Sequence, residues 1–205
     1  MAVFSNFIKS MSVRRQIQET NGVYFITFTC ARWLPLFEMV NGYDTVYKWF
    51  DYLKQQGHYI AGYVIMPNHL HVLIAFSETT IAINTIIANG KRFMAYELVK
   101  RLKEQNREDI LELMQGWVNK TDQLKNQKHA VFEPSFDRKE CFSLTFLKQK
   151  ADYMHQNPCK AGMVSLPEDY KHSSAKYYYT GIQGTYPVIT YMELQDIDLT
   201  SSCRE

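Results

Sequence analysis

The stretch Tyr63-Val64-Ile65-Met66-Pro67-Asn68-His69-Leu70-His71-Val72-Leu73-Ile74 sets two histidines between two apolar runs. Side chains of a β-strand alternate between its faces, so His69 and His71 are predicted to share one face and Leu70 to point to the other. Pro67-Asn68 predicts a tight turn, and therefore an antiparallel hairpin with the histidines near a strand end. Two neutral imidazoles side by side make half of a metal site. Such a pair is also found as an ordinary half-buried feature, and the spacing alone leaves both interpretations open.

The composition is that of an ordinary globular protein. Its 205 residues can form one domain with a real core, and 46% are hydrophobic while 21% are charged. The net charge of +2 favours no particular partner, so the distribution of charge matters more than its total. No apolar run is long enough to cross a membrane, and no membrane partner is expected. None of the four cysteines form a C-x-x-C pair, which favours a reduced, cytoplasmic protein: Cys30, Cys141, Cys159 and Cys203.

Hydrophobic periodicity predicts strands and helices along most of the chain. The predicted elements, in order, are a strand at 22–31, a helix at 43–56, strands at 59–66 and 69–76, a helix at 83–105, a short helix at 109–117, an edge strand at 129–136 interrupted by Pro134, and a helix at 143–157 with Ser143 as its N-cap. This order predicts an α+β fold, with a ferredoxin-like antiparallel sheet and its helices on one face.

We divide the chain into a basic N-terminal arm at 1–20, one domain at 21–180 and a C-terminal tail at 181–205. The predicted helix at 83–105 carries more basic than acidic residues. Its charged side could contact phosphates or could simply be solvated, and the sequence leaves this open.

A second cluster with chemical potential is Tyr153-Met154-His155-Gln156-Asn157-Pro158. Tyr153 and Asn157 are four residues apart and would share one helix face. A tyrosine hydroxyl can act as a nucleophile, and an amide oxygen is a good ligand for a hard cation. Tyr153 at the edge of the core and Asn157 as a helix-terminal residue are the plain alternatives. His155 lies on another face of the helix, so we interpret it as structural or as facing a bound ligand, rather than as the base.

Together these motifs resemble the HUH single-tyrosine transposases, and most closely the branch associated with bacterial repetitive extragenic palindromes (REP). The resemblance rests on residues 66–74, on 152–158 continuing through 160–164, and on 170–175. It extends over roughly residues 22–179.

This resemblance implies a DNA-cleaving enzyme. His69, His71 and Asn157 match the family's metal ligands, for Mg²⁺ or Mn²⁺, and Tyr153 matches the nucleophile. In such enzymes the tyrosine attacks a phosphodiester of single-stranded DNA, leaving a 5′-phosphotyrosine link and a free 3′-hydroxyl that can later reverse the reaction. A phenol is mostly protonated at neutral pH, so a divalent ion that offsets the developing charge would help the attack.

The chain also departs from the family pattern. A Trp-Gln pair is common in the strand before the tyrosine helix, and this chain has Val131-Phe132-Glu133-Pro134 there. The polar segment at 106–128 is longer than expected. These differences bear on DNA recognition more than on the chemistry, because all four chemical positions are present.

The expected partner is single-stranded or hairpin DNA, bound by a monomer or a homodimer. Exposed aromatic rings can stack on bases, and basic side chains can contact the backbone. The candidate DNA contacts are Arg14, Arg15, Lys91, Arg92, Lys148 and Lys150. Two other functions stay open, namely a domesticated hairpin-DNA-binding protein without transposition activity and a metal-dependent hydrolase that uses the histidines without Tyr153.

Overall fold

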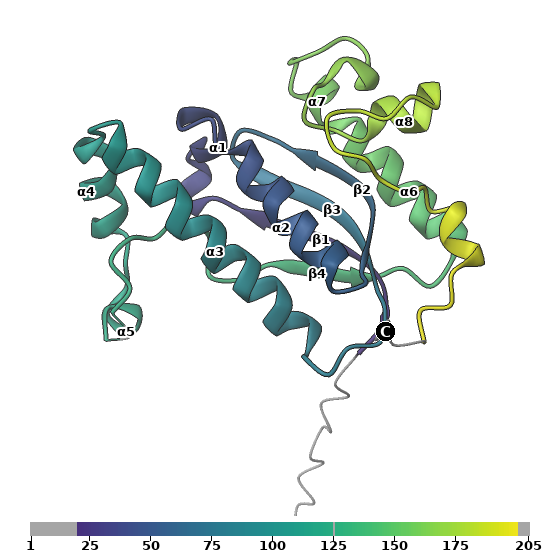
Figure 1. Cartoon of the computed structure of the whole chain (residues 1–205). Coiled ribbons are helices and arrows are strands. Elements are labelled where there is room, and N and C mark those ends of the chain that lie inside the picture. The colour runs from purple at the N-terminus through teal and green to yellow at the C-terminus, as the bar shows by residue number, and fades with distance from the viewer. Residues whose placement is uncertain (1–19, 125, 201–205) are drawn as a thin grey trace, which may run out of the picture.

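A four-stranded antiparallel sheet in the order β2-β3-β1-β4 forms the centre of the computed structural model, which describes residues 20–124 and 126–200 (Figure 1). The strands are β1 (Gly22–Thr29), β2 (Tyr59–Ile65), β3 (His69–Phe76) and β4 (Asp137–Glu140). Strands β1 and β3 are central neighbours although η1, α1, α2 and β2 come between them in sequence. The expected α+β class and ferredoxin-like topology are confirmed.

Helices and short helical turns connect and cover the strands. In chain order they are η1 (Ala31–Trp33), α1 (Leu36–Met39), α2 (Tyr43–Gln55), α3 (Ile83–Glu104), α4 (Glu108–Gly116), α5 (Lys120–Gln123), α6 (Leu144–His155), α7 (Asn157–Lys160), η2 (Pro167–Asp169), α8 (Ala175–Thr180) and η3 (Glu193–Asp196). The predicted helices are present with small shifts at their ends, and Ser143 caps α6 by accepting a hydrogen bond from the Phe146 amide.

Helices α2 and α3 cover one face of the sheet (Figure 1). Because strand side chains alternate, one set from β1 and β3 points to these helices, including Ile26, Phe28, Leu70 and Val72. These side chains are buried against α2 and α3 in the larger hydrophobic core.

Helix α6 lies on the other face of the sheet, where a second core forms. Phe25 of β1 and Leu73 of β3 meet Leu147, Ala151 and Met154 of α6 there. Helices α2 and α3 lie on one face, as expected, and α6 lies on the other face, so helices cover both faces of the sheet. The residues of β1 and β3 that face each side of the sheet are largely apolar, so each side has to be covered by other elements.

The fourth strand is not where the sequence pattern predicted it. It is formed by Asp137–Glu140, after the predicted segment at 129–136. Pro134 cannot donate to a strand ladder, and the charged strand that follows pairs along only one edge, with β1. A strand made of four charged residues has no apolar alternation, so periodicity could not reveal it.

The predicted C-terminal tail packs on the domain as far as residue 200. Tyr186 is buried and donates its hydroxyl proton to Asp51, and the Ile189 amide donates to the Ile60 carbonyl. The polar segment at 106–128 contains α4 and α5, which extend from the far end of α3 (Figure 1). The predicted N-terminal arm lies outside the described residues, apart from Thr20. No helix in the described ranges has the length and apolarity to span a bilayer.

Candidate active site

The turn before the histidine strand is fixed by backbone hydrogen bonds on several sides. The Met66 amide donates to the His69 carbonyl at 2.8 Å, which closes the predicted hairpin. The Cys30 and Phe37 amides donate to the carbonyls of Asn68 and Pro67, at 2.8 and 3.0 Å. Strand β3 therefore enters the sheet in a fixed register, with His69 as its first residue.

His69 and His71 project from the same face of β3, as their spacing predicted. Their ring centroids are 4.8 Å apart. The Asn68 amide donates from Nδ2 to the Trp33 carbonyl, so its Oδ1 faces Nδ1 of His69, 2.7 Å away. An amide oxygen only accepts, so Nδ1 of His69 must carry the proton and Nε2 the lone pair.

His71 is held in a similar way. Its Nδ1 lies 2.7 Å from Oγ1 of Thr27, the residue directly opposite on β1. With Nδ1 in this hydrogen bond, Nε2 is the nitrogen left to act as a ligand. Burial lowers the pKa of His69 to about 4 and that of His71 to about 3, and for His71 the nearby His69 and Lys150 contribute further. Both rings are therefore neutral at pH 7, the form that binds metals.

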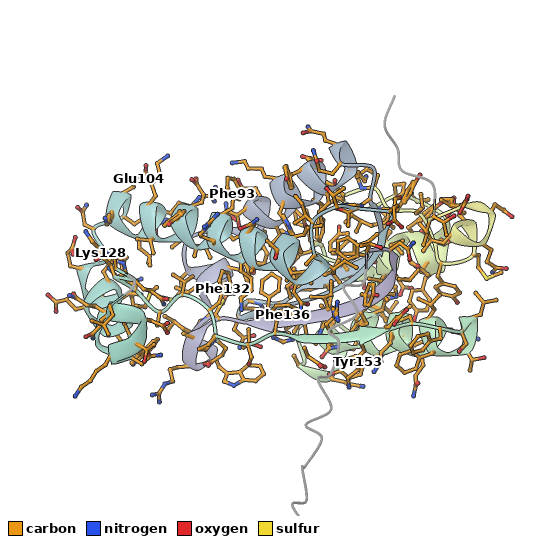
Figure 2. All side chains as sticks on the ribbon, turned by 90° about the horizontal axis from the view of Figure 1, so that it is seen from below. Phe93, Glu104, Lys128, Phe132, Phe136 and Tyr153 are labelled. Carbon is orange, nitrogen blue, oxygen red and sulfur yellow. The ribbon has the colours of Figure 1, made fainter. Side chains whose placement is uncertain are left out.

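Tyr153 of α6 stands over the histidine strand. Its ring meets the ring of His71 edge-on, with centroids 5.4 Å apart, and that of Phe25 at 6.2 Å. The side chain is 45% exposed, so its hydroxyl can be reached from solvent. Figure 2 shows Tyr153 and Phe93 of α3 on opposite sides of the molecule. The tyrosine and the histidine pair thus share the face of the sheet that α6 covers.

Asn157 begins α7, one turn beyond Tyr153. Its Nδ2 donates to the Tyr153 carbonyl at 2.8 Å, and this bond does not use Oδ1, the atom of the amide that can act as a metal ligand. No cluster of three His, Cys, Asp or Glu side chains suited to a metal ion occurs within 20–124 and 126–200. The candidate ligands include only two residues of these four types, because the third ligand is an asparagine. Two neutral imidazoles and one amide oxygen fit a divalent cation that keeps water and substrate oxygens as further ligands.

Two lysines flank the tyrosine ring. Nζ of Lys150 lies 5.8 Å from the centroid of Tyr153, and Nζ of Lys160 lies 5.3 Å from it. Lys150 was predicted as a DNA contact, whereas sequence analysis did not assign a role to Lys160. Its position beside Tyr153 depends on the bend between α6 and α7, which no local pattern specifies.

The other predicted DNA contacts are dispersed. Lys91 is buried, and its amine donates to the carbonyls of Glu133 and Ser135 at 2.8 and 3.2 Å. Burial lowers its pKa to about 8. Arg92 is exposed on α3, on the other side of the sheet, and Lys148 is exposed on α6. Arg14 and Arg15 lie outside the described residues.

His155 has a structural position, which agrees with its predicted separation from the tyrosine face. It is 1% exposed, and its Nε2 lies 2.8 Å from Oγ of Ser174. The same hydroxyl accepts a hydrogen bond from the Tyr63 amide of β2. His155 and Ser174 thereby fasten the tyrosine helix to the sheet.

Two residues that no sequence pattern indicated lie beside the histidines. Thr27 orients His71, and Trp33, which is 62% exposed, lies edge-on to His69 with ring centroids 5.7 Å apart. Both come from the region of β1 and η1, far from His69 in sequence. The register of β1 against β3 identifies Thr27, and the hydrogen bond from Asn68 to the Trp33 carbonyl places Trp33, and sequence periodicity provides neither.

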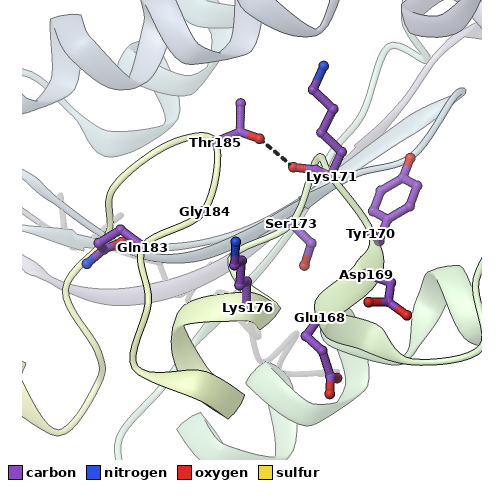
Figure 3. Close-up of a pocket in the computed structure, with 9 residues that line it drawn as sticks. All are labelled: Glu168, Asp169, Tyr170, Lys171, Ser173, Lys176, Gln183, Gly184 and Thr185. Atoms are coloured by element: carbon purple, nitrogen blue, oxygen red, sulfur yellow. Dashed lines mark hydrogen bonds between the residues drawn. The ribbon is translucent and has the colours of Figure 1, made fainter.

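A separate polar pocket of about 300 Å³ lies between η2, α8 and the loop at 183–185 (Figure 3). Its walls include Lys176 and Glu168, and Thr185 donates its hydroxyl proton to the Lys171 carbonyl at 2.8 Å. None of the predicted site residues that the structure describes lines this pocket.

Comparison with known proteins supports the fold assignment. No protein-family model and no curated protein matches the sequence. Among solved structures, a REP-associated tyrosine transposase bound to a REP hairpin matches with a TM-score of 0.55 and 16% identity, over 95% of this chain and 100% of that chain. A transposase candidate from Deinococcus radiodurans R1 matches at a TM-score of 0.41 and 14% identity, over 67% of this chain and 92% of that one. The chain therefore has the fold of the REP-associated tyrosine transposase, at a sequence identity of 16%.

Proposed function

We propose that this protein is an HUH-type single-tyrosine transposase that cleaves and rejoins single-stranded or hairpin DNA through a 5′-phosphotyrosine intermediate. The observation that carries the proposal is the meeting of Tyr153 with the pair His69 and His71, from segments far apart in the chain. The fold, shared with a tyrosine transposase, supports it.

In the proposed reaction the phenolic oxygen of Tyr153 attacks a DNA phosphorus atom. The new bond joins this oxygen to phosphorus, and the bond from phosphorus to the 3′-oxygen of the upstream nucleotide breaks. The phenol loses a proton and the departing 3′-oxygen gains one, so charge and atoms balance. Reversal by the 3′-hydroxyl rejoins the strand without an external energy source, because the phosphotyrosine ester conserves the bond energy.

Lys150 and Lys160 suit this attack electrostatically. Both amines lie within 6 Å of the Tyr153 ring centroid. Positive charges beside the nucleophile stabilise the negative charge that develops on the phenol and phosphate oxygens. Lys150 and Lys160 are the lysines that we propose for the DNA backbone at the cleavage site, and Lys148, exposed elsewhere on α6, is a further candidate. Lys91 is left out because its amine is buried and already donates to two carbonyls.

His69, His71 and Asn157 are the residues that would hold Mg²⁺ or Mn²⁺. When bound, such an ion polarises a phosphate oxygen and offsets charge in the transition state. The protein's contribution is to keep both imidazoles neutral by burial and to orient them through Asn68 and Thr27.

Covalent capture tests the proposal directly. The protein is incubated with labelled single-stranded hairpin oligonucleotides and Mn²⁺, and the products are separated on a denaturing gel. We expect label on the wild-type protein and none on Tyr153→Phe. Tyr52→Phe is the matched control, because Tyr52 is similarly exposed, at 51% against 45%, and belongs to α2 on the other face.

The same assays, with His69→Ala added to the set of variants, also separate the rival functions. Label retained by Tyr153→Phe would overturn the assignment of the nucleophile. DNA binding in a gel shift without any adduct, over a range of hairpins, would instead favour the domesticated hairpin-binding protein. DNA hydrolysis that depends on His69 but not on Tyr153 would favour the metal-dependent hydrolase.

A further inference from the structure

Trp33 is a large exposed aromatic residue beside the histidine pair. It is 62% exposed, whereas Trp49 is 2% exposed in the main core. Its indole meets the His69 ring edge-on, with centroids 5.7 Å apart. Because Trp33 is exposed at the candidate site, its indole offers a flat apolar surface that a planar ligand can cover.

The backbone that presents Trp33 is unusual. Arg32 and Trp33 have φ values of 53° and 60°, in the left-handed region that side chains other than glycine rarely adopt. Such strain persists only where surrounding contacts impose it, and it is concentrated at functional sites.

Three hydrogen bonds impose this conformation. The Trp33 amide donates to the Cys30 carbonyl at 3.0 Å, and the Trp33 carbonyl accepts from Asn68 at 3.3 Å. The Arg32 amide donates to the Glu133 carboxylate at 2.9 Å. Asn68 thus supports both Trp33 and His69, so the indole is built into the same unit as the histidines.

The ring contacts place Trp33 on the opposite side of the histidine pair from Tyr153, the proposed nucleophile. Tyr153 contacts His71, and Trp33 contacts His69, so they lie at opposite ends of the histidine pair. In phosphoryl transfer the attacking and leaving oxygens are roughly in line through phosphorus. The leaving 3′-oxygen and its nucleotide therefore lie on the side away from Tyr153, which is the side of Trp33.

We propose that Trp33 is a base-stacking platform for the nucleotide immediately 5′ of the scissile phosphate. The ligand is an unpaired DNA base, whose ring lies on the exposed indole while its 3′-oxygen is the leaving group. Stacking on an aromatic ring accepts any base, so Trp33 positions the strand rather than reading its sequence. The polarity of this assignment rests on the proposed tyrosine chemistry.

Fluorescence tests the platform without any cleavage. In a Tyr153→Phe background, a single-stranded deoxythymidine oligonucleotide is expected to quench tryptophan emission, and an abasic chain of the same length is not. Adding Trp33→Phe should remove the quench, leaving Trp49 and Trp117 as the emitters. An unchanged quench in this double variant would overturn the proposal.

Cleavage kinetics test the position of the base. An abasic site directly 5′ of the cut should lower kcat/KM about tenfold for the wild-type protein and little for Trp33→Ala, since the stack is already absent there. Trp33→Phe should restore most of the activity. Phe93→Ala, an exposed aromatic on the opposite side of the molecule (Figure 2), should behave as the wild type.

The outcomes distinguish the two proposals. If the abasic site lowers kcat/KM equally in the wild type and in Trp33→Ala, while adduct formation is intact, the stacking proposal is overturned and the tyrosine chemistry stands. If no adduct forms on any hairpin but Trp33 is quenched by bases, the tyrosine chemistry fails while the platform stands as a single-strand binding site. Melting curves of each variant establish that it is folded.

Discussion

The rings of Tyr153 and His71 meet edge-on, with centroids 5.4 Å apart, although the two residues belong to helix α6 and the central strand β3. The contact exists because α6 packs on the face of the sheet that α2 and α3 leave uncovered. Any change that alters the position of α6 should therefore affect the candidate chemistry, even when it leaves the histidines untouched.

Removal of Lys160 should slow covalent capture. Its amine lies 5.3 Å from the Tyr153 ring centroid, so Lys160→Ala takes away positive charge where negative charge develops. We expect a loss of about tenfold or more in the single-turnover rate. Lys48→Ala is the control, because it removes an exposed lysine from α2. Equal rates in both variants would exclude a role for Lys160.

Thr27→Val should weaken the binding of the metal ion and so raise the Mn²⁺ concentration that capture requires. The variant keeps the shape of the side chain but removes the hydroxyl that orients His71 through Nδ1. Loss of such a partner typically costs about 10- to 100-fold in metal affinity or activity. The Mn²⁺ concentration for half-maximal capture measures the effect, and Thr27→Ser should restore the wild-type value. No rescue by serine would indicate that packing, not the hydrogen bond, is what matters.

Folding stability should fall as the pH is lowered from 7 to about 4. All six histidines lie in the described residues, and burial lowers the pKa of each. For His155 the folded pKa is about 3, against about 6.5 for an unfolded chain. Between these values only the unfolded state binds the proton, so stability is fully present above about pH 6.5 and declines below it.

Urea unfolding at a series of pH values measures this decline. His155 alone can contribute at most about 1.4 kcal/mol per pH unit within that window. His155→Gln cannot take up a proton, so its stability should depend less steeply on pH even if the variant is less stable throughout. An unchanged slope would mean that His155 is protonated in the folded protein.

Gly90→Ala should destabilise the protein. A Cβ at Gly90 in α3 would overlap the indole nitrogen of Trp49 in α2, so the two helices would have to move apart. Overpacking of this kind costs about 1–3 kcal/mol. Gly116→Ala at the end of α4 meets no atom within 4 Å and should be neutral or stabilising by up to about 1 kcal/mol. The difference between their urea midpoints separates packing from glycine flexibility.

Most elements could be predicted from local sequence, and the exceptions have physical causes. Strand β4 escaped prediction because four charged residues carry no alternation, and its pairing with β1 defines it. Lys91 was predicted to contact phosphate because a basic residue in a helical sequence does not reveal how buried its side chain is. In the structure Lys91 is buried and donates to the carbonyls of Glu133 and Ser135.

The family departures have a structural explanation as well. Phe132, in the segment 131–134 where the Trp-Gln pair was expected, is buried and meets Phe28 edge-on in the main core. Glu133 accepts the Arg32 amide and so helps to set the backbone beneath Trp33. Phe132 therefore stabilises the core, and Glu133 supports the backbone that presents Trp33.

Local sequence patterns were enough to predict the two motifs of the candidate site. The two-residue spacing of His69 and His71 placed both on one face, and the four-residue spacing of Tyr153 and Asn157 placed them one turn apart, because strand and helix periods are fixed by backbone geometry. The contact between Tyr153 and His71, and the positions of Thr27, Lys160 and Trp33 beside these residues, arise from the tertiary structure. Sheet register and helix packing depend on contacts between distant segments, which no local pattern contains.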